Sequence, residues 1–400
     1  MSSASPAAPV SDLPDLGDTR IAFAAKSDRA LWQAYWLFRV IGSPGLTATG
    51  TVLTKVALAL HLPVKGLIKA TIFKQFVGGE TIQESLRTAE RLAASHVGTI
   101  LDFSVEGQDD DEALDATTAE TLRTIAAAKE NAHIPFAVFK PTGVARMGIM
   151  EKVSSGATLT AAEHEEWERT KARMLRICQA AYDADIPVLV DAEESWIQPA
   201  IDDLVTDMMR RFNRERAIVF NTVQLYRHDR LPFLQESLAA ARRDGYHLGV
   251  KLVRGAYMEK ERAQAEAEGR PSPIQPDKAA SDRDYDAALR FCMDHLERMA
   301  VVAGTHNEAS TLLLARLMAE HGVARNDHRI WFAQLLGMSD NITFNMAAAG
   351  YNVAKYVPYG PVRQVMPYLF RRANENTSAR GQTGRELGLI MAERRRRKRG

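Results

Sequence analysis

Hydrophobic and polar positions follow a repeating pattern from Gly98 onward. Short apolar runs alternate with polar turns and helix-length amphipathic segments, which is typical of βα units that form a parallel sheet. The apolar runs predict strands at 99–103, 136–140, 188–191, 218–221, 249–253, 301–305, 330–333 and 353–356. The amphipathic segments predict helices at 119–130, 161–184, 197–213, 232–243, 284–297, 308–320, 340–348 and 362–376.

The number of repeats favours one α/β architecture over another. Eight strand-and-helix repeats match a (β/α)8 TIM-like barrel better than a doubly wound sheet, although counting leaves the open sheet as an alternative. Residues 19–95 have a helical pattern without a strand, with Trp32, Trp36 and Phe38 early and a Gly78-Gly79 break before a helix near Thr81. We therefore predict a barrel with an N-terminal helical extension.

The two ends of the chain differ from the predicted barrel. Residues 1–18 contain small residues, prolines and acids without the basic start of a secretory signal, so we expect a disordered leader. We place the helical region at 19–95, the barrel at 96–380 and a basic C-terminal tail at 381–400. The apolar stretch at 41–73 is interrupted by prolines and lysines, so it contains no apolar run long enough to span a bilayer. We expect a cytoplasmic protein that is at most peripheral at the inner membrane.

Charge and cysteine content exclude several classes of function. The 51 Lys and Arg residues nearly balance 50 Asp and Glu, and the six basic residues at 394–399 exceed the net charge of +1. The remaining body is mildly acidic, which argues against a nucleic-acid surface. A terminal basic run of this kind is typically a solvated tail. Cys178 and Cys292 are the two cysteines, so we expect neither a disulfide framework nor a cysteine-rich metal site.

Polar residues gather at the C-terminal ends of the predicted strands. Six such positions carry varied chemistry: Lys140, Asp191, Gln224, Arg254, His306 and Tyr356. In a (β/α)8 barrel these ends converge on one face, where active sites are built. A single residue of this kind is often a turn former or a helix cap, but six together predict a site.

The last repeat carries the most informative chemistry. The segment YVPYG at 356–360 leads into a helix that bears Tyr368, Arg371, Arg372 and Glu375. Their spacing puts Tyr368, either Arg371 or Arg372, and Glu375 along one face of that helix. Paired arginines can hold a small carboxylate through bidentate hydrogen bonds, with Glu375 orienting one guanidinium. The alternative is a charged surface helix with ordinary ion pairs.

Eight motifs in order resemble those of the proline dehydrogenases. They are FKPTG at 139–143, DAEES at 191–195, TVQLY at 222–226, KLVRGAY at 251–257, THN at 305–307, QLLGM at 334–338, YVPYG at 356–360, and Tyr368 with RRANEN at 371–376. Together they cover about 240 residues. The resemblance implies a distorted (β/α)8 barrel with noncovalent FAD, which oxidises L-proline to 1-pyrroline-5-carboxylate and passes electrons to a membrane quinone.

The resemblance also implies roles for individual residues. Arg371, Arg372 and Lys140 are expected to bind the proline carboxylate, with Glu375 paired to an arginine and Asp191 in the polar network beside the substrate. The ring is expected to be enclosed by Tyr257, Leu335, Tyr356 and Tyr368. Positions that match flavin contacts in the family are Gln224, Lys251, Val253, Arg254, Gly255, Thr305, His306 and Asn307.

Two positions depart from many bacterial members of the family. Lys251 stands where those proteins have an arginine near flavin N5, and Met258 stands where they have a tryptophan beside the isoalloxazine. A lysine provides a point charge without the fork geometry of arginine. Tyr356 is retained, and a bulky residue there favours proline over 4-hydroxyproline.

The sequence also leaves other functions to be weighed. It has no glycine-rich dinucleotide fingerprint, phosphate loop, HExxH or paired-cysteine spacing, so an NAD or metal enzyme fits poorly. The alternatives are a Schiff-base lyase acting through Lys140, another barrel oxidoreductase, or a non-catalytic scaffold. We expect a monofunctional enzyme with a separate pyrroline-5-carboxylate dehydrogenase downstream, and the sequence leaves a homo-oligomer open.

Overall fold

The eight predicted apolar runs form the strands of one closed parallel barrel in the computed structural model of the chain. The structure describes residues 13–60, 63–104, 109–378 and 380–399, with side chains described in these ranges except at 44, 55–59, 374–378 and 380–383. The strands are β1 (Gly98–Phe103), β2 (Phe136–Phe139), β3 (Val188–Val190), β4 (Val219–Gln224), β5 (Leu248–Val253), β6 (Met299–Gly304), β7 (Ile330–Leu335) and β8 (Val353–Tyr359).

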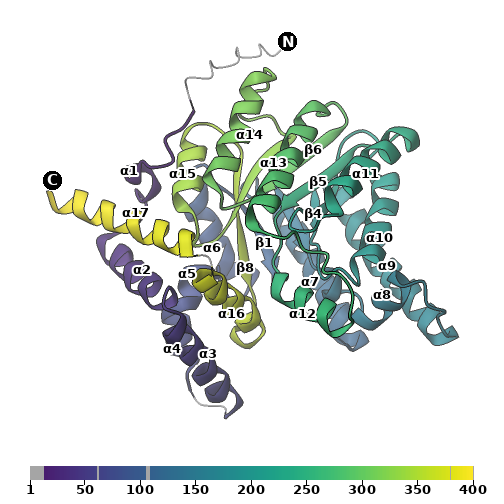
Figure 1. The fold of residues 1–400 in the computed structure, drawn as a ribbon, viewed down its shortest axis with the longest axis horizontal. Coiled ribbons are helices and arrows are strands. Elements are labelled where there is room, and N and C mark those ends of the chain that lie inside the picture. The colour runs from purple at the N-terminus through teal and green to yellow at the C-terminus, as the bar shows by residue number, and fades with distance from the viewer. Residues whose placement is uncertain (1–12, 61–62, 105–108, 379, 400) are drawn as a thin grey trace.

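Each strand pairs in parallel with its neighbour in the chain, and β1 closes the barrel against β8. Helices surround the strands in Figure 1. The predicted (β/α)8 barrel is therefore confirmed, and the doubly wound alternative is wrong. The helices that follow β1 to β4 are α7 (Asp111–Lys129), α8 (Met147–Ser154) and α9 (Ala161–Ala184), α10 (Gln198–Phe212) and α11 (Arg230–Asp244); a 3-10 turn at Pro141–Gly143 follows β2 directly. Those that follow β5 to β8 are α12 (Met258–Ala267) and α13 (Lys278–Asp294), α14 (Glu308–Glu320), α15 (Asp340–Ala348), α16 (Val362–Ser378) and α17 (Arg380–Arg399).

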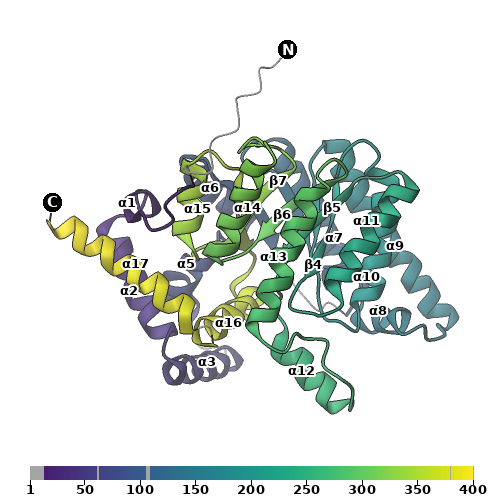
Figure 2. The same cartoon turned by 45° about the horizontal axis from the view of Figure 1, so that its top comes forward.

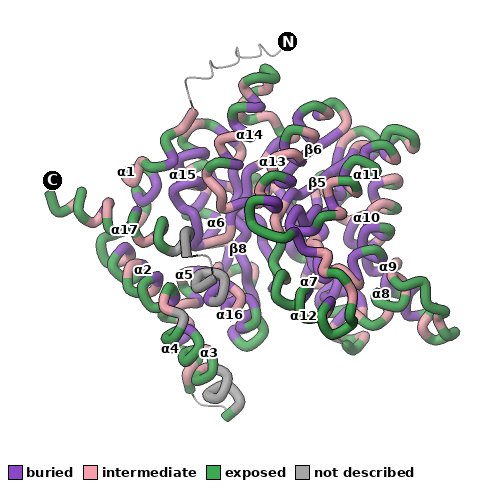
Figure 3. Tube along the Cα trace, in the orientation of Figure 1, coloured by how far each residue is buried: buried purple, intermediate pink, exposed green. Residues whose placement is uncertain are grey.

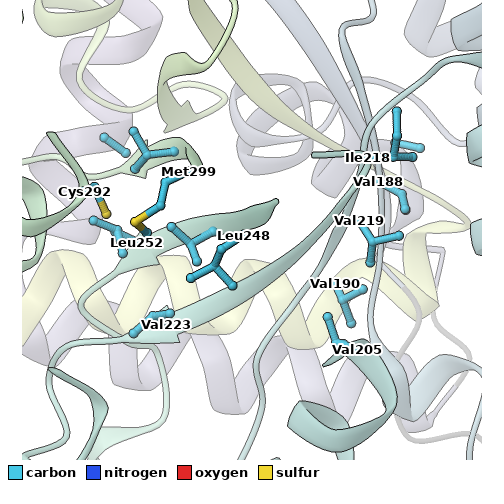
Figure 4. Packing of buried hydrophobic residues seen from close by; sticks show 14 of the residues in the cluster. Val188, Val190, Val205, Ile218, Val219, Val223, Leu248, Leu252, Cys292 and Met299 are labelled. Carbon is cyan, nitrogen blue, oxygen red and sulfur yellow. The ribbon is translucent and has the colours of Figure 1, made fainter. Parts of the chain in front are cut away.

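Strand residues divide between two cores because successive side chains point to opposite faces of a strand. Ile100, Val138 and Leu189 point into the barrel and belong to an inner apolar cluster. Val188 and Val190 belong to the larger cluster between the strands and the helices. Figure 4 shows this outer packing, with Val188, Val190, Val205, Ile218, Val219, Val223, Leu248, Leu252, Cys292 and Met299 labelled.

The helical region before the barrel is confirmed in its secondary structure. It contains α1 (Thr19–Ala22), α2 (Asp28–Ile41), α3 (Pro44–Ala59), α4 (Lys65–Ile68), a π-helical turn at Lys69–Phe73, α5 (Lys74–Phe76) and α6 (Ile82–Ala93). Thr81 caps α6 by accepting a hydrogen bond from the Glu84 backbone N–H. Of the expected leader at 1–18, residues 1–12 lie outside the described residues, whereas Leu16 is buried and packed against the barrel core.

The C-terminal basic segment differs from the solvated tail that we expected. Residues 381–399 belong to α17, which packs against α2 and carries the buried side chains Leu389 and Ile390. Arg397 donates hydrogen bonds to the carbonyls of Phe23 and Lys26 at 2.8 Å. Leu389 and Ile390 join apolar side chains from α2, α5 and α16 in a cluster of residues from 22–77 and 338–390. We call this cluster the terminal core.

A membrane span is not among the elements that the structure describes. Within the described ranges, none of the helices combines the length and the apolar composition that crossing a bilayer requires.

Candidate active site

A cavity of about 700 Å³ opens at the C-terminal ends of the strands. Its walls come from the residues after β2, β3, β5 and β6, from the ends of β4 and β7, from β8, and from α16 and α17. Figure 2 shows α16 and α12 at one end of the barrel. The cavity is lined by sixteen residues predicted from the sequence: Lys140, Asp191, Gln224, Lys251, Val253, Arg254, Gly255, Tyr257, Thr305, His306, Asn307, Leu335, Tyr356, Tyr368, Arg371 and Arg372. The side chain of Glu375 lies outside the described residues.

A buried network of charges occupies one part of the cavity wall. Lys140 Nζ lies 2.8 Å from Asp102 Oδ1 and 3.5 Å from Asp191 Oδ2. Lys251 Nζ donates to the other oxygen of Asp191 and, at 2.7 Å, to the hydroxyl of Tyr356. These five side chains come from β1, from the residues just after β2 and β3, and from β5 and β8. Closure of the barrel brings them together.

The network keeps its members in defined protonation states. Burial alone would raise the pKa of Asp191, but attraction to Lys251 and Lys140 outweighs burial and lowers the pKa below its ordinary value. Burial and the nearby carboxylates of Asp191 and Asp102 raise the pKa of Tyr356 well above its ordinary value. Asp191 is therefore a carboxylate and Tyr356 a neutral phenol across the physiological range.

The paired arginines face the cavity from α16. The guanidinium carbon of Arg371 lies 5.9 Å from the ring centre of Tyr257, and that of Arg372 lies 5.0 Å from the ring centre of Tyr368. Arg372 is buried, with 5% of its surface exposed. The alternative of a charged surface helix does not hold at Arg372, which is buried. Both arginines lie where an anionic group in the cavity could meet them.

A second polar group gathers around the start of α14. Arg254 donates to the hydroxyl of Thr305 at 2.9 Å and to that of Ser310 at 3.1 Å. Asn307 caps α14, since its side chain accepts from the backbone N–H of Ser310. Together with the N-terminus of this helix, Arg254 gives this part of the cavity donors suited to an anionic ligand.

Gln224 and Gly255 are two further residues of the cavity wall. Gln224 Nε2 donates to the Glu193 carbonyl at 3.1 Å, whereas Gln224 Oε1 is buried and has no hydrogen-bond partner among the described residues. Gly255 has φ of 146°, and a Cβ there would lie 2.3 Å from the ring of Tyr226, so both the backbone conformation and the packing of Tyr226 require glycine. The site thus offers a buried acceptor to a ligand that carries a donor.

The structure brings into the cavity several residues that the sequence reasoning missed. Asp102 could have been found as the one charged residue in the apolar segment GTILDF of β1. Ser339 and Glu386 carried no such signal. His306 Nδ1 lies 2.9 Å from the Ser339 hydroxyl, and the Ser339 backbone N–H donates to Glu386 of α17. The other missed residues with polar side chains are Thr222, Lys278, Glu308, Gln334, Asn341 and Arg385.

Burial changes the protonation of two of these groups. Burial, followed by repulsion from Lys355, Arg372 and Arg254, lowers the pKa of His306 to about 3. Burial, followed by repulsion from Asp340, raises the pKa of Glu386 to about 7. His306 is therefore neutral at physiological pH, and Glu386 titrates near neutrality.

Tyr356 lies differently from our expectation, and Met258, which departs from the family pattern, lies outside the cavity wall. Tyr356 does not end β8 but lies in its middle, because the strand continues to Tyr359; its side chain still reaches the cavity. Met258 is the first residue of α12, is 41% exposed and does not line the cavity.

Known proteins with similar sequences indicate the family of this chain. The chain is 37% identical over 329 residues to the carbapenem antibiotics biosynthesis protein CarD of Pectobacterium carotovorum, covering 82% of this chain and 85% of that protein. It is 41% identical to human mitochondrial proline dehydrogenase 1, covering 62% of this chain and 42% of the human protein. The match therefore spans less than half of the human protein's length.

Solved structures support the same fold. The structure of proline utilization A from Bdellovibrio bacteriovorus inactivated by N-propargylglycine has a TM-score of 0.70 with 19% identity, covering 89% of this chain and 38% of that one. The sequence profile of the proline dehydrogenases matches residues 85–385, which include all eight strands of the barrel and every residue that lines the cavity except Glu386. This chain belongs to the proline dehydrogenase family.

Proposed function

We propose that this protein oxidises L-proline to 1-pyrroline-5-carboxylate with noncovalently bound FAD, as the first step of proline catabolism to glutamate. One observation carries the proposal: the paired arginines of α16 and the buried network around Asp191 line the same cavity. Proline has a carboxylate, a secondary amine and a small saturated ring, and the cavity offers cations, a carboxylate and tyrosine rings.

The arginines of α16 are proposed to fix the substrate by its carboxylate. Arg371 and Arg372 each present a planar set of donors that matches a carboxylate, and partial burial strengthens such a pair. Tyr257 and Tyr368 lie against these guanidinium groups, while Tyr356 and Leu335 line the same cavity. Aromatic walls with polar tips suit a saturated ring that carries one charged substituent.

The residues present fit a flavin dinucleotide. The unpartnered Oε1 of Gln224 suits a ring N–H donor, and Arg254 with Thr305 and Asn307 suits phosphate oxygens. Gly255 lines the same cavity. Val253 and His306 line the same part of the cavity, and the neutral His306 can act as either donor or acceptor. FAD, when bound, would supply the acceptor for the hydride that leaves proline C5.

The network around Asp191 is proposed to hold charge beside the reacting ring. Lys251 and Lys140 hold Asp191 as a carboxylate, and Lys251 also holds the hydroxyl of Tyr356 in place. All four groups are thereby oriented before the substrate enters, which lowers the reorganisation needed during reaction. The Lys251 ammonium places a positive charge at the position expected near the flavin ring.

The Schiff-base alternative fits this arrangement less well. A lysine must present a free electron pair to attack a carbonyl group. Lys140 Nζ instead lies between the carboxylates of Asp102 and Asp191. It is better placed as a fixed cation than as a nucleophile.

The proposal includes an electron acceptor and a following enzyme. A membrane quinone is proposed to take the electrons, and a separate pyrroline-5-carboxylate dehydrogenase to act on the product. We also propose a cytoplasmic location with peripheral contact to the inner membrane. A homo-oligomer is compatible with the proposal and is not required by it.

Anaerobic titration with L-proline tests the reaction directly. The purified protein should carry flavin absorbance that bleaches as proline is added, and the solution should accumulate 1-pyrroline-5-carboxylate. A flavin-containing protein that proline does not bleach would overturn the proposed substrate.

Substitution of the arginines tests the carboxylate assignment. Arg371→Met and Arg372→Met should each raise the KM for proline by about 10- to 100-fold, because each removes hydrogen bonds to a charged group. Flavin absorbance should change little. Gln364→Met, at an exposed position of the same helix, is the matched control and should leave KM unchanged. Unaltered proline kinetics in both arginine variants would contradict the assignment.

A further inference from the structure

The DAEES segment at 191–195, which follows β3, contains polar residues that the proposed reaction does not use. Asp191 belongs to the charged network of the cavity. The side chains of Glu193, Glu194 and Ser195 do not line the cavity. Each of these three side chains instead contacts a neighbouring turn or helix at the same end of the barrel. The contacts therefore join separate segments that build the cavity wall.

Ser195 is bound by a buried carboxylate from α12. Glu261 is 0% exposed, and its two oxygens accept from the Ser195 backbone N–H at 2.6 Å and from the Ser195 hydroxyl at 2.5 Å. Glu193 makes the same pair of contacts with Thr142 in the turn after β2, at 2.8 and 2.5 Å. Burying a carboxylate is unfavourable unless its oxygens are hydrogen-bonded. Each pair therefore holds its two segments in one relative position.

Helix α12 depends on this contact because its other anchors are weak. Glu261 and Ala265 are its buried residues, and an alanine buries little apolar surface. Figure 3 shows α12 exposed along most of its length. Lys260 pairs with Glu194, but its side chain is 55% exposed, and exposed ion pairs contribute little. The buried contact of Glu261 is thus the main link between α12 and the segment after β3.

The first turn of α12 connects this anchor to the cavity. Tyr257 is the N-cap residue of the helix and lines the cavity. Its carbonyl accepts from the backbone N–H of Glu261 at 2.9 Å, so the anchored residue lies one helical turn after the tyrosine. The ring centre of Tyr257 lies 5.9 Å from the guanidinium carbon of Arg371. Movement of the first turn would therefore move the tyrosine away from this arginine.

We propose that Glu261 is a positioning residue for the substrate: through its contact with Ser195 it holds Tyr257 in place against Arg371. Glu261 does not line the cavity, so it acts through Tyr257 and not by contact with a ligand. Because Ser195 and Asp191 belong to the same segment, the contact also fixes Tyr257 relative to the charged network. The effect on proline rests on the proposed function, whereas the anchoring of α12 does not.

Steady-state kinetics with proline test the proposal. Glu261→Gln keeps the size of the side chain but replaces one acceptor with an NH2 group that faces a donor. It should raise the KM for proline about 5- to 20-fold and leave kcat and the dissociation constant of FAD within about twofold of the parent. Ser195→Ala removes only the hydroxyl and should raise KM less. Glu266→Gln, at an exposed position of α12, is the matched control and should leave KM unchanged.

A double variant separates positioning from a general loss of structure. If Glu261 acts through Tyr257, Glu261→Gln should raise KM no further once Tyr257→Ala is present. An undiminished effect of Glu261→Gln in the Tyr257→Ala background would contradict the proposal. So would an unchanged KM in both Glu261→Gln and Ser195→Ala.

Hydrogen exchange of the α12 amides tests the anchor without the reaction. Exchange at 258–267 should be at least about tenfold faster in Glu261→Gln than in the parent, while exchange in α13 stays the same. Equal exchange rates in α12 would overturn the anchoring role. If proline does not bleach the parent protein, the proposed function fails, and the exchange comparison still decides whether Glu261 anchors α12.

Discussion

Glu386 enters the cavity wall from α17 and is buried beside Ser339 and Asp340. Its pKa is raised from 4.5 to about 7. The folded protein therefore holds a proton on this group that the unfolded chain has released, so the free energy of unfolding should fall as pH rises from 4.5 to about 7. Glu386 couples the stability of the cavity wall to pH in the neutral range.

Glu386→Gln should remove this dependence. The variant should be more stable than the parent above about pH 7, by up to about 3 kcal/mol, and close to it near about pH 4.5. Urea unfolding across this range measures the difference. Parallel curves for the parent and the variant would show that Glu386 does not titrate there.

Asp340 compensates a buried lysine. Lys355 is almost fully buried in β8 and lies 3.0 Å from Asp340, which also pairs with Lys26 at 2.8 Å. Burial would raise the pKa of Asp340, but Lys26 and Lys355 outweigh burial and lower it. A depressed carboxyl pKa stabilises the fold above the unfolded value of 3.8, and this stabilisation is lost as pH falls below it.

Asp340→Asn should be strongly destabilising. It leaves the Lys355 ammonium buried without its carboxylate, which should cost about 3–5 kcal/mol of unfolding free energy near neutral pH. Asp207→Asn breaks an exposed ion pair with Arg210 and should cost less than about 1 kcal/mol. Equal costs in denaturant unfolding would contradict the role given to Asp340.

At the scale of elements, α17 is held by a narrow set of apolar contacts. Ile390 is 1% exposed in the terminal core, whereas the adjacent Met391 is 38% exposed. Ile390→Ala should lower the free energy of unfolding by about 2–5 kcal/mol through lost packing and a residual cavity. Met391→Ala should change it by less than about 1 kcal/mol. Similar losses in thermal unfolding would mean that α17 is not packed as described.

The barrel strands could be predicted because their apolar runs recur with helices between them. The end of β8 could not, because Pro358 normally argues against a strand that is paired on both sides. The strand continues because Asp102 and Phe103 of β1 pair with Pro358 and Tyr359, and the Pro358 carbonyl accepts from Gly78. Helix α12 was missed because charged residues dominate it and only Glu261 and Ala265 are buried.

The packing of α17 could not be predicted from the sequence, for a different reason. The charge of the basic run at 394–399 by itself predicts a tail. Arg396 and Arg397 of this run pair with Glu393, and Arg397 also contacts Asp28 and backbone carbonyls. The Lys26 carbonyl is 371 residues away from Arg397 in the chain. A contact at that separation is decided by tertiary structure, which no local pattern reports.

Part of the candidate site could likewise be predicted from the sequence, and part of it could not. Strand-end positions such as Lys140 and Asp191 could be predicted because parallel strands of a barrel end on one face. Their pairing could not, since the contact of Lys251 with both Asp191 and Tyr356 joins β5, β3 and β8 across the barrel. Glu386 escaped prediction because it reaches the cavity from outside the repeats.

At the scale of the whole molecule, the cavity joins the barrel to the terminal helices. Because strands, α16 and α17 all contribute to its wall, a ligand that binds there should stabilise the entire fold. FAD at about one hundred times its dissociation constant should add about 2.7 kcal/mol to the free energy of unfolding. Gln224→Leu should weaken this effect by removing the buried acceptor. An unfolding temperature that is independent of FAD concentration would argue against a flavin site.

The terminal core also affects how the protein folds during its synthesis, because both ends of the chain contribute to it. Phe38 and Phe76 belong to it from the N-terminal side, and Leu369 and Ile390 complete it from the other. Because synthesis runs from the N-terminus, the first aromatic side chains leave the ribosome long before their partners exist. During that interval they are exposed apolar surface that a chaperone can bind. The terminal core is therefore completed only after the last helix has been made, and an interrupted chain would leave part of its N-terminal apolar surface uncovered.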